Sequence, residues 1–223
     1  MSESAEVELH WIGHDGFTVR GKDTSNNDIT IYIDPYQLSK IQQNKNDADL
    51  VLISHNHYDH LSIDDLKQVI SKQTSIIAAK ECSEQLKEID VQEVKTVSPG
   101  DKVVIRGIPI ETVPAYNTNK KFHPKSDEKV GYVFTVSNQR IYHTGDTDII
   151  PEMRSINPDI ALVPVSGTYV MTAEEAAQAV NEYIRPKKVA IPMHYGSIVG
   201  TDKDAEKFSL LVKTCETKIL KRE

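Results

Sequence analysis

The sequence predicts a mixed α/β fold, and three patterns support this prediction. Residues 50–53 and 160–163 are short runs of mostly branched apolar side chains, which are typical of buried strands. Residues 29–33 alternate in the manner of a half-buried strand. Between such strands, apolar residues recur at the spacing of a helix with one buried face. After position 62 this spacing is seen at Ile63, Leu66, Val69 and Ile70.

The N-terminal part begins with a predicted strand pair. Apolar residues alternate over 7–11 and again over 17–19, on either side of the turn Gly13-His14-Asp15-Gly16. A histidine in such a turn can simply face solvent. The third strand, 29–33, ends at Asp34-Pro35, where the aspartate is placed to cap a turn.

The densest group of possible metal ligands follows the buried run 50–53. His55, His57, Asp59 and His60 lie within six residues. Residues two apart in an extended segment share a face, so His55 and His57 can converge on one ion. Asp59 and His60, past a bend, can face a second ion. The pattern therefore predicts a metal site on a loop between a strand and a helix.

The motif His55-x-His57-x-Asp59-His60 resembles the signature of the metallo-β-lactamase superfamily. The resemblance implies a four-layer αββα sandwich and two divalent metal ions bound at one edge. Zinc is the expected metal, with manganese or iron as alternatives. The resemblance spans roughly residues 10–208.

The third ligand of the first ion departs from the family pattern. The strand that supplies a histidine in the family leads here to Tyr116-Asn117. We favour His123, six residues downstream, as the replacement, with Asn117 or Tyr116 as alternatives. A loop histidine fixed only by the neighbouring Pro124 remains the other interpretation.

Two further ligands follow from the resemblance. Gly145-Asp146-Thr147 matches the family's Gly-Asp-Thr element, so Asp146 is expected to bridge both ions. Residues 187–194 read as a strand that ends on His194, the expected remaining ligand of the second ion. His143 does not fall on a motif position and is expected to pack within its strand.

The resemblance also suggests residues around the ligands. Asp34 is expected to bind a metal-ligating histidine and fix its tautomer, as an alternative to the turn cap. His14 is expected near the metals or the substrate. The weaker candidates for substrate contacts are Lys121, Tyr169 and Tyr195.

The remaining segments read as ordinary α/β layering. Strands are expected at 76–79, 94–97 and 102–112, the last with a bend at Gly107, and a hairpin at 130–136 and 140–144. A short helix is predicted at 83–89 and a closing helix over 205–212. Ser62 with Asp65, and Thr172 with Glu175, are predicted to cap two further helices.

Composition limits the possible partners. The length of 223 residues suits one domain, 1–223, and the net charge of −7 makes nucleic acid an improbable partner. No apolar run approaches the roughly 20 residues of a membrane span. The acidic residues 1–6 do not resemble a signal peptide, and two unrelated cysteines suggest free thiols, so we expect the cytoplasm. A homo-oligomer is possible.

The resemblance implies hydrolysis by a metal-bridging hydroxide. Asp59 would orient this nucleophile and relay a proton to the leaving group. The small-molecule substrate is expected to contain a phosphodiester or lactone-type bond. The motif looks most similar to the branch with ascorbate-phosphate lactonase and N-acyl-phosphatidylethanolamine phospholipase D. The departure at Asn117 keeps an alternative open: a metal-binding regulatory or sensor protein without turnover.

Overall fold

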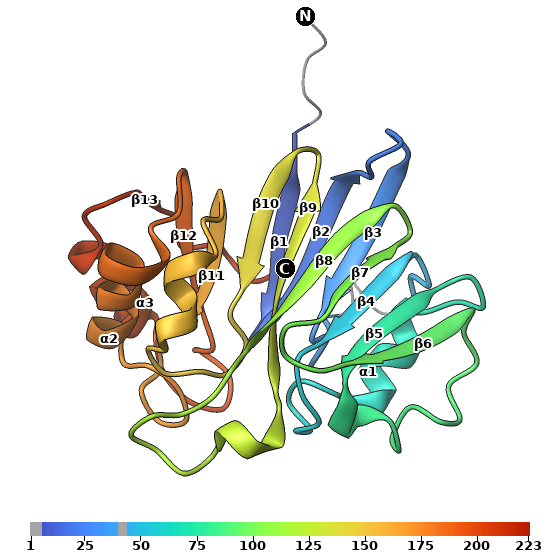
Figure 1. The fold of residues 1–223 in the computed structure, drawn as a ribbon, viewed down its shortest axis with the longest axis horizontal. Helices are drawn as coiled ribbons and strands as arrows, with labels where there is room; N and C mark the ends of the chain where they lie inside the picture. The colour runs from blue at the N-terminus through green and yellow to red at the C-terminus, as the bar shows by residue number, and fades with distance from the viewer. Residues whose placement is uncertain (1–5, 40–43) are drawn as a thin grey trace, which may run out of the picture.

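Two β-sheets lie face to face, with helices on their outer sides (Figure 1). The computed structural model describes residues 6–39 and 44–223; most of the N-terminal segment considered for a signal peptide lies outside these ranges. The first sheet has the order β1-β2-β3-β4-β5-β6 and the second β13-β12-β11-β10-β9-β8-β7. This arrangement confirms the expected layered α/β sandwich.

Each sheet has an antiparallel half and a parallel half. In the first sheet, β1 (Glu8–Gly13), β2 (Gly16–Lys22) and β3 (Asp28–Ile33) are antiparallel, whereas β4 (Leu50–Ile53), β5 (Ser75–Ala79) and β6 (Glu93–Val97) continue in parallel. In the second sheet, the antiparallel strands are β7 (Lys102–Ile105), β8 (Ile108–Pro114), β9 (Val130–Val136) and β10 (Gln139–His143). The parallel strands that follow are β11 (Ile160–Pro164), β12 (Val189–Met193) and β13 (Glu216–Thr217).

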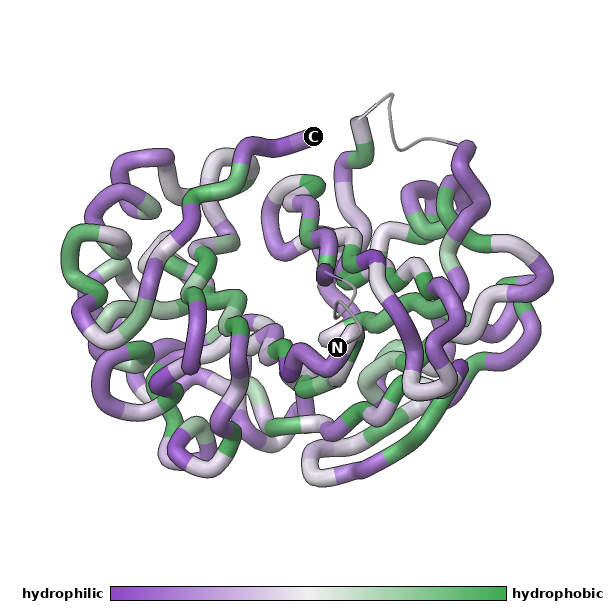
Figure 2. Tube along the Cα trace, turned by 90° about the horizontal axis from the view of Figure 1, so that it is seen from above, coloured by the Kyte–Doolittle hydropathy of each residue, from purple (hydrophilic) through white to green (hydrophobic). Residues whose placement is uncertain are grey.

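Buried strands explain the apolar runs in the sequence. All four residues of β4 and all five of β5 are buried, because one face of the sheet packs on the second sheet and the other is covered by α1 (Ile63–Val69). Figure 2 shows hydrophobic segments running through the interior and many hydrophilic segments on the outer loops. Among the described residues, no helix is long and apolar enough to cross a membrane.

The two sheets are tied together where β4 ends. The hydroxyl of Tyr132 on β9 donates to the carbonyl of Ile53 at 2.7 Å, and the backbone N–H of Val130 donates to the carbonyl of Ser54 at 3.1 Å. Both bonds come from the second sheet and hold the last residues of β4. The loop that carries the histidine motif therefore starts from a fixed backbone.

Helix boundaries follow the capping residues. Ser62 accepts from the N–H of Asp65 at the start of α1. Thr172 and Glu175 form the predicted capping box of α2 (Ala173–Gln178), which continues as a π-helical segment to Ile184. The closing helix, α3 (Asp202–Leu211), packs beside α2.

Two local predictions were wrong. Residues 83–89 do not form a helix: a single 3-10 turn covers Lys80–Cys82 and further turns follow. Leu86 is the one fully buried side chain of that segment, so little burial offsets the cost of helix nucleation. Asp65 does not complete a capping box, because its carboxylate accepts from the N–H groups of Gln37 and Leu38.

Candidate metal centre

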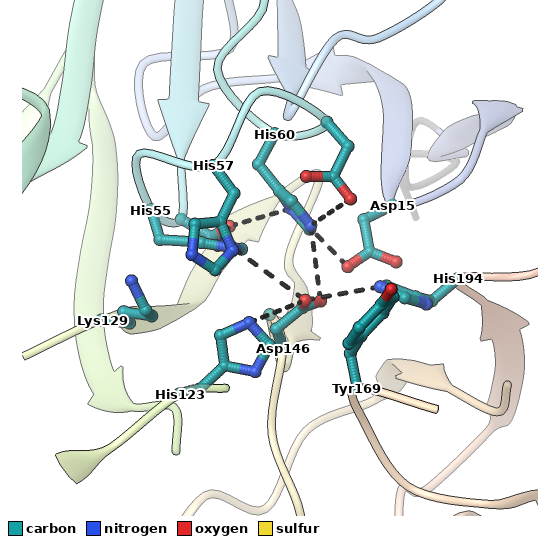
Figure 3. A network of polar contacts seen from close by, with 12 residues as sticks. Asp15, His55, His57, His60, His123, Lys129, Asp146, Tyr169 and His194 are labelled. Carbon is teal, nitrogen blue, oxygen red and sulfur yellow. Dashed lines mark hydrogen bonds and ion pairs between the residues drawn. The ribbon is translucent and has the colours of Figure 1, made fainter. Parts of the chain in front are cut away.

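The centre lies at one edge of the sandwich, where loops from both sheets meet. The histidine motif follows β4, His123 lies between β8 and β9, Asp146 follows β10, and His194 follows β12. Figure 3 shows these side chains pointing toward a common point. Segments far apart in the sequence thus bring their ligand-type residues together.

Three histidines form a first group of possible ligands. One nitrogen from each of His55, His57 and His123 lies within 4.8 Å of the others. Burial lowers the pKa of each of the three imidazoles, and for His55 the pKa falls well below 6.5. These side chains are therefore neutral at pH 7, which is the form that binds a metal.

A second group surrounds His60 and His194. Ligand atoms of His14, Asp59, His60 and His194 lie within 4.8 Å of one another. Burial works against a charged His60, but the charges of Asp146 and Asp34 raise its pKa well above 6.5. Unlike the first group, this one combines imidazoles with carboxylates.

Asp146 lies between the two groups and is 3% exposed. Its Oδ2 is 3.3 Å from Nε2 of His123 and 3.3 Å from Nε2 of His194, while its Oδ1 is 3.5 Å from Nε2 of His60. One carboxylate therefore faces imidazoles of both groups. This position is suited to a residue that bridges two cations.

The donor atoms fit divalent metal ions. Within the described residues, Nε2 of His60, Nε2 of His194 and Oδ1 of Asp146 are buried and have no hydrogen-bond partner. Buried polar atoms normally find a partner, because leaving one unpaired costs free energy. Imidazole and carboxylate atoms that converge without partners form a donor set of the kind that binds zinc, manganese or iron.

A further layer of hydrogen bonds orients the second group. Oδ2 of Asp34 lies 2.9 Å from Nδ1 of His60 and also accepts from the hydroxyl of Ser54. The N–H of Ser54 donates to Oδ1 of the same carboxylate at 2.8 Å. On the other side, the hydroxyl of Ser166 lies 2.9 Å from Nδ1 of His194. These contacts leave Nε2 of each imidazole facing the centre.

His14 contacts Asp59 rather than solvent. Its Nε2 is 3.0 Å from Oδ2 of Asp59. Burial lowers the pKa of His14 to about 4. Burial acts to raise the pKa of Asp59, but the hydrogen bond with His14 and the charge of His60 outweigh it and lower that pKa to about 2. Asp59 is thus a carboxylate at neutral pH.

Three of these residues adopt the left-handed backbone region. The φ angles of His14, Asp34 and His194 are 51°, 40° and 60°. Non-glycine residues rarely adopt such angles, and they cluster at functional sites where surrounding contacts hold them. Here the carbonyl of His14 accepts from the N–H of His194 at 3.0 Å and from Nε1 of Trp11 at 2.9 Å.

Asn117 holds His123 in place. Its side-chain oxygen accepts from the N–H of His123 at 2.9 Å, and its backbone N–H donates to the carbonyl of His123 at 2.7 Å. The Asn117 amide also donates to the carbonyl of Tyr169 at 2.9 Å. The departure from the family pattern is therefore accompanied by a loop that returns a different histidine to His55 and His57.

A cleft of about 620 Å³ opens beside the centre. Lys121 and Tyr169 line it, whereas Tyr195 is not among its lining residues. Tyr195 is 1% exposed and its ring stacks on that of Trp11 with centroids 4.7 Å apart, so its contact with a substrate stays a prediction. The lining residues are Asn56, His57, Tyr58, Asp59, Lys121, Phe122, His123, Asp146, Tyr169 and Ile198.

Comparisons with known proteins show the family of this chain. Residues 8–194 match the family model of the beta-lactamase superfamily domain. The chain belongs to the metallo-β-lactamase superfamily. A UPF0173 metal-dependent hydrolase of Thermoplasma acidophilum is 31% identical over 224 residues, covering 96% of this chain and 94% of that protein. One from Staphylothermus marinus is 33% identical over 227 residues, covering 95% and 94%.

Solved structures support the fold of this superfamily. A protein of Parabacteroides distasonis described as a candidate metal-dependent hydrolase superposes with a TM-score of 0.80 at 29% identity, covering 97% of this chain and 94% of that one. A metallo hydrolase of Ignicoccus hospitalis gives a TM-score of 0.72 at 24% identity, covering 97% and 95%. The solved structures thus agree with the superfamily that the sequence match shows.

Sequence reasoning missed several residues that this superfamily member places at its centre. Asp15 is fully buried, and burial together with the charge of Asp146 raises its pKa well above 3.8. Lys129 is 3% exposed and pairs with Glu81 at 2.8 Å, next to the first group (Figure 3). The position of Asp15 directly after His14 is the one feature of the sequence that could have pointed to it. The sequence holds no such feature for Lys129 or Glu81. His143, expected to pack in its strand, is buried with Nε2 2.9 Å from the carbonyl of Asp15.

Proposed function

We propose that this protein is a two-metal hydrolase that cleaves a phosphodiester or lactone-type bond in a small molecule. One observation carries the proposal: two groups of buried ligand atoms face a single carboxylate, Asp146, and several of these atoms have no partner among the described residues. A centre that needed only one ion would not require both groups. Two ions about 3.5 to 4 Å apart are the usual arrangement in hydrolases that stabilise both the attacking and the leaving oxygen.

The donor sets assign a role to each ligand. His55, His57 and His123 would hold the first ion, and Asp59, His60 and His194 the second, with Asp146 shared. Zinc suits the three-histidine set, and manganese or iron is an alternative for the second. When bound, the ions would supply Lewis acidity and make water a stronger acid at neutral pH.

Asp59 is placed to accept the proton of the attacking water and transfer it. It lines the cleft, and its hydrogen bond with His14 fixes the direction of the carboxylate. With its pKa lowered to about 2, Asp59 is ionised at pH 7 and can accept a hydrogen bond from an attacking water. It can then carry the proton toward the leaving group. The buried, neutral His14 contributes the orientation of the carboxylate rather than a second positive charge.

The cleft favours a small anionic substrate with an apolar portion. Its volume of about 620 Å³ lies in the range of small-molecule sites. Lys121 is a cation on the wall, and Phe122 packs edge-on against Tyr169 with ring centroids 4.7 Å apart. We propose that the protein acts like the branch with ascorbate-phosphate lactonase and N-acyl-phosphatidylethanolamine phospholipase D, whose substrates combine a phosphate with a larger organic group.

Location and domain organisation belong to the same proposal. Cys82 and Cys215 are both free, which supports a reducing compartment such as the cytoplasm. A hydrophobic core that includes residues from Trp11 to Val212 supports a single domain.

Metal analysis beside a hydrolase screen tests the proposal. Purified protein is loaded with Zn²⁺ or Mn²⁺, its metal content is measured, and it is offered phosphodiester, lactone and thioester substrates. We expect two ions per chain and hydrolysis that Asp59→Ala reduces by at least about a hundredfold. Asp49→Asn is the control and should stay near the wild-type rate, because Asp49 lies at the end of β4 opposite the histidine motif and outside the ligand groups.

Two results would count against the proposal. A fully loaded protein that cleaves none of the three substrate classes would instead favour a regulatory or sensor protein of the same fold. An Asp59→Ala variant as active as the wild type would remove Asp59 from the mechanism.

A further inference from the structure

We propose that Asp15 is an additional ligand of the second ion and makes this half of the centre prefer an oxygen-seeking divalent ion such as Mn²⁺ over Zn²⁺. The inference rests on the proposed two-metal function and deepens it. One oxygen of Asp15 lies within 4.8 Å of ligand atoms of His60, Asp146 and His194. Figure 3 shows its carboxylate directed into the centre.

The side chain of Asp15 has no hydrogen-bond partner among the described residues. Its residue exposure is 0%, and neither carboxylate oxygen has a hydrogen-bond partner among residues 6–39 and 44–223. The nearest nitrogen, Nδ1 of His60, is 3.8 Å from Oδ2 and is 2.9 Å from Asp34. Since Asp34 uses that nitrogen, Asp15 is left without a donor. A buried carboxylate in this condition needs a cation to be stable.

Other buried carboxyl groups lie close to Asp15. Asp34 and Asp146 are both buried, and both contact the same imidazole, His60. Placing a third carboxylate beside the same histidine is unfavourable, because like charges repel strongly at the low dielectric of a protein interior. A divalent ion between Asp15, Asp146 and the two imidazoles offsets this repulsion.

The turn that carries Asp15 is held by contacts from distant strands. The carbonyl of Asp15 lies 2.9 Å from Nε2 of the buried His143 on β10. The preceding residue, His14, is held by Trp11 and by the N–H of His194. The backbone on each side of the side chain is therefore fixed by contacts from distant strands. Ligands of metal sites are commonly fixed in this way.

The two halves of the centre then differ in chemistry. The first set consists of three imidazoles, the composition of many zinc sites. The second would contain the imidazoles of His60 and His194 and the carboxylates of Asp15, Asp59 and Asp146. Carboxylate oxygens shift a site toward harder ions such as Mn²⁺, which accept more ligands than tetrahedral zinc.

Metal binding by Asp15→Asn tests this assignment, because asparagine keeps the volume and removes the charge. Metal-free full-length protein is titrated with Mn²⁺, and the free ion is followed by electron paramagnetic resonance. We expect the variant to bind the Mn²⁺ of the second set at least about tenfold more weakly than the wild type. Its affinity for one Zn²⁺ at the three-histidine set should change less than twofold. Asp49→Asn, which changes a carboxylate at the opposite end of β4, should bind both metals like the wild type.

Thermal unfolding supplies a second readout. Without metal, Asp15→Asn should unfold within about 2 °C of the wild type, because the Asp15 side chain makes no hydrogen bond among the described residues that the variant would lose. With saturating Mn²⁺ the wild type should unfold at the higher temperature, because it binds the ion more tightly. A residue with only a packing role would give the same difference in Tm under both conditions.

Three outcomes of these experiments decide whether Asp15 binds the second ion. Mn²⁺ affinity within twofold of the wild type would overturn the proposal. If the variant fails to fold, crystals of the Mn²⁺-loaded wild type are the test: an anomalous peak beside the Asp15 carboxylate supports the assignment, and a peak away from it overturns it. A wild type that binds no metal at all would instead refute the proposed two-metal function.

Discussion

Replacing Asn117 with alanine tests how this chain completes its three-histidine group. The side chain of Asn117 makes two hydrogen bonds, one to the N–H of His123 and one to the carbonyl of Tyr169. A buried hydrogen bond contributes about 1 kcal/mol to stability. Losing both should lower the free energy of unfolding by about 2 kcal/mol. For a chain of this size that corresponds to a fall in Tm of about 4 to 8 °C.

The same substitution should weaken zinc binding. Without its anchor, the His123 loop no longer holds an imidazole against His55 and His57. Loss of a residue that orients a ligand typically costs 10- to 100-fold in affinity, so we expect about that reduction for one ion. The assay is competition for Zn²⁺ against a chromogenic chelator at pH 7.5, beside thermal unfolding of the metal-free protein.

Asn119→Ala is the matched control. It lies in the same loop, and its exposed side chain donates to Glu175 rather than to the His123 backbone. Its zinc affinity and Tm should stay close to the wild-type values. The reasoning would be refuted if Asn117→Ala lost stability as expected but bound zinc within twofold of the wild type, because His123 would then not depend on Asn117.

Two further substitutions test the residues behind the ligands. Asp34→Asn removes a carboxylate that contacts both Ser54 and His60, so the ion held by His60 should bind about 10- to 100-fold more weakly in the same competition assay. Asp49→Asn, at the opposite end of β4, should leave metal affinity unchanged; equal losses in both variants would contradict a specific role for Asp34. Lys129→Met removes the ammonium group beside Glu81, whose carboxylate then keeps only the N–H of Asn56, and should destabilise the protein by about 2 to 3 kcal/mol in denaturant unfolding. The double variant with Glu81→Gln should regain part of this loss, and no recovery would show that the pair is not coupled.

The local sequence determined the elements and the motif. The apolar runs at β4 and β11 and the hairpin of β9 and β10 were predictable, because burial and turn chemistry act over a few residues. The convergence of His55, His57, Asp59 and His60 was also predictable, because it depends only on the end of β4 and on the bend that follows. The failed helix at 83–89 shows the limit of this reasoning, since the burial needed for a helix comes from the rest of the fold.

The tertiary structure alone decided how the centre is completed. The role of Asn117 depends on a loop that folds back onto it, and the burial of Asp15 depends on strands far away in the chain. The contact between His143 and the Asp15 carbonyl joins residues 128 positions apart, and Lys129 reaches Glu81 across 48. No local pattern encodes such pairs, because they form only when the edges of two sheets are packed together. The sequence shows which residue types can bind a metal ion. The packing of the two sheets determines which other residues contact them.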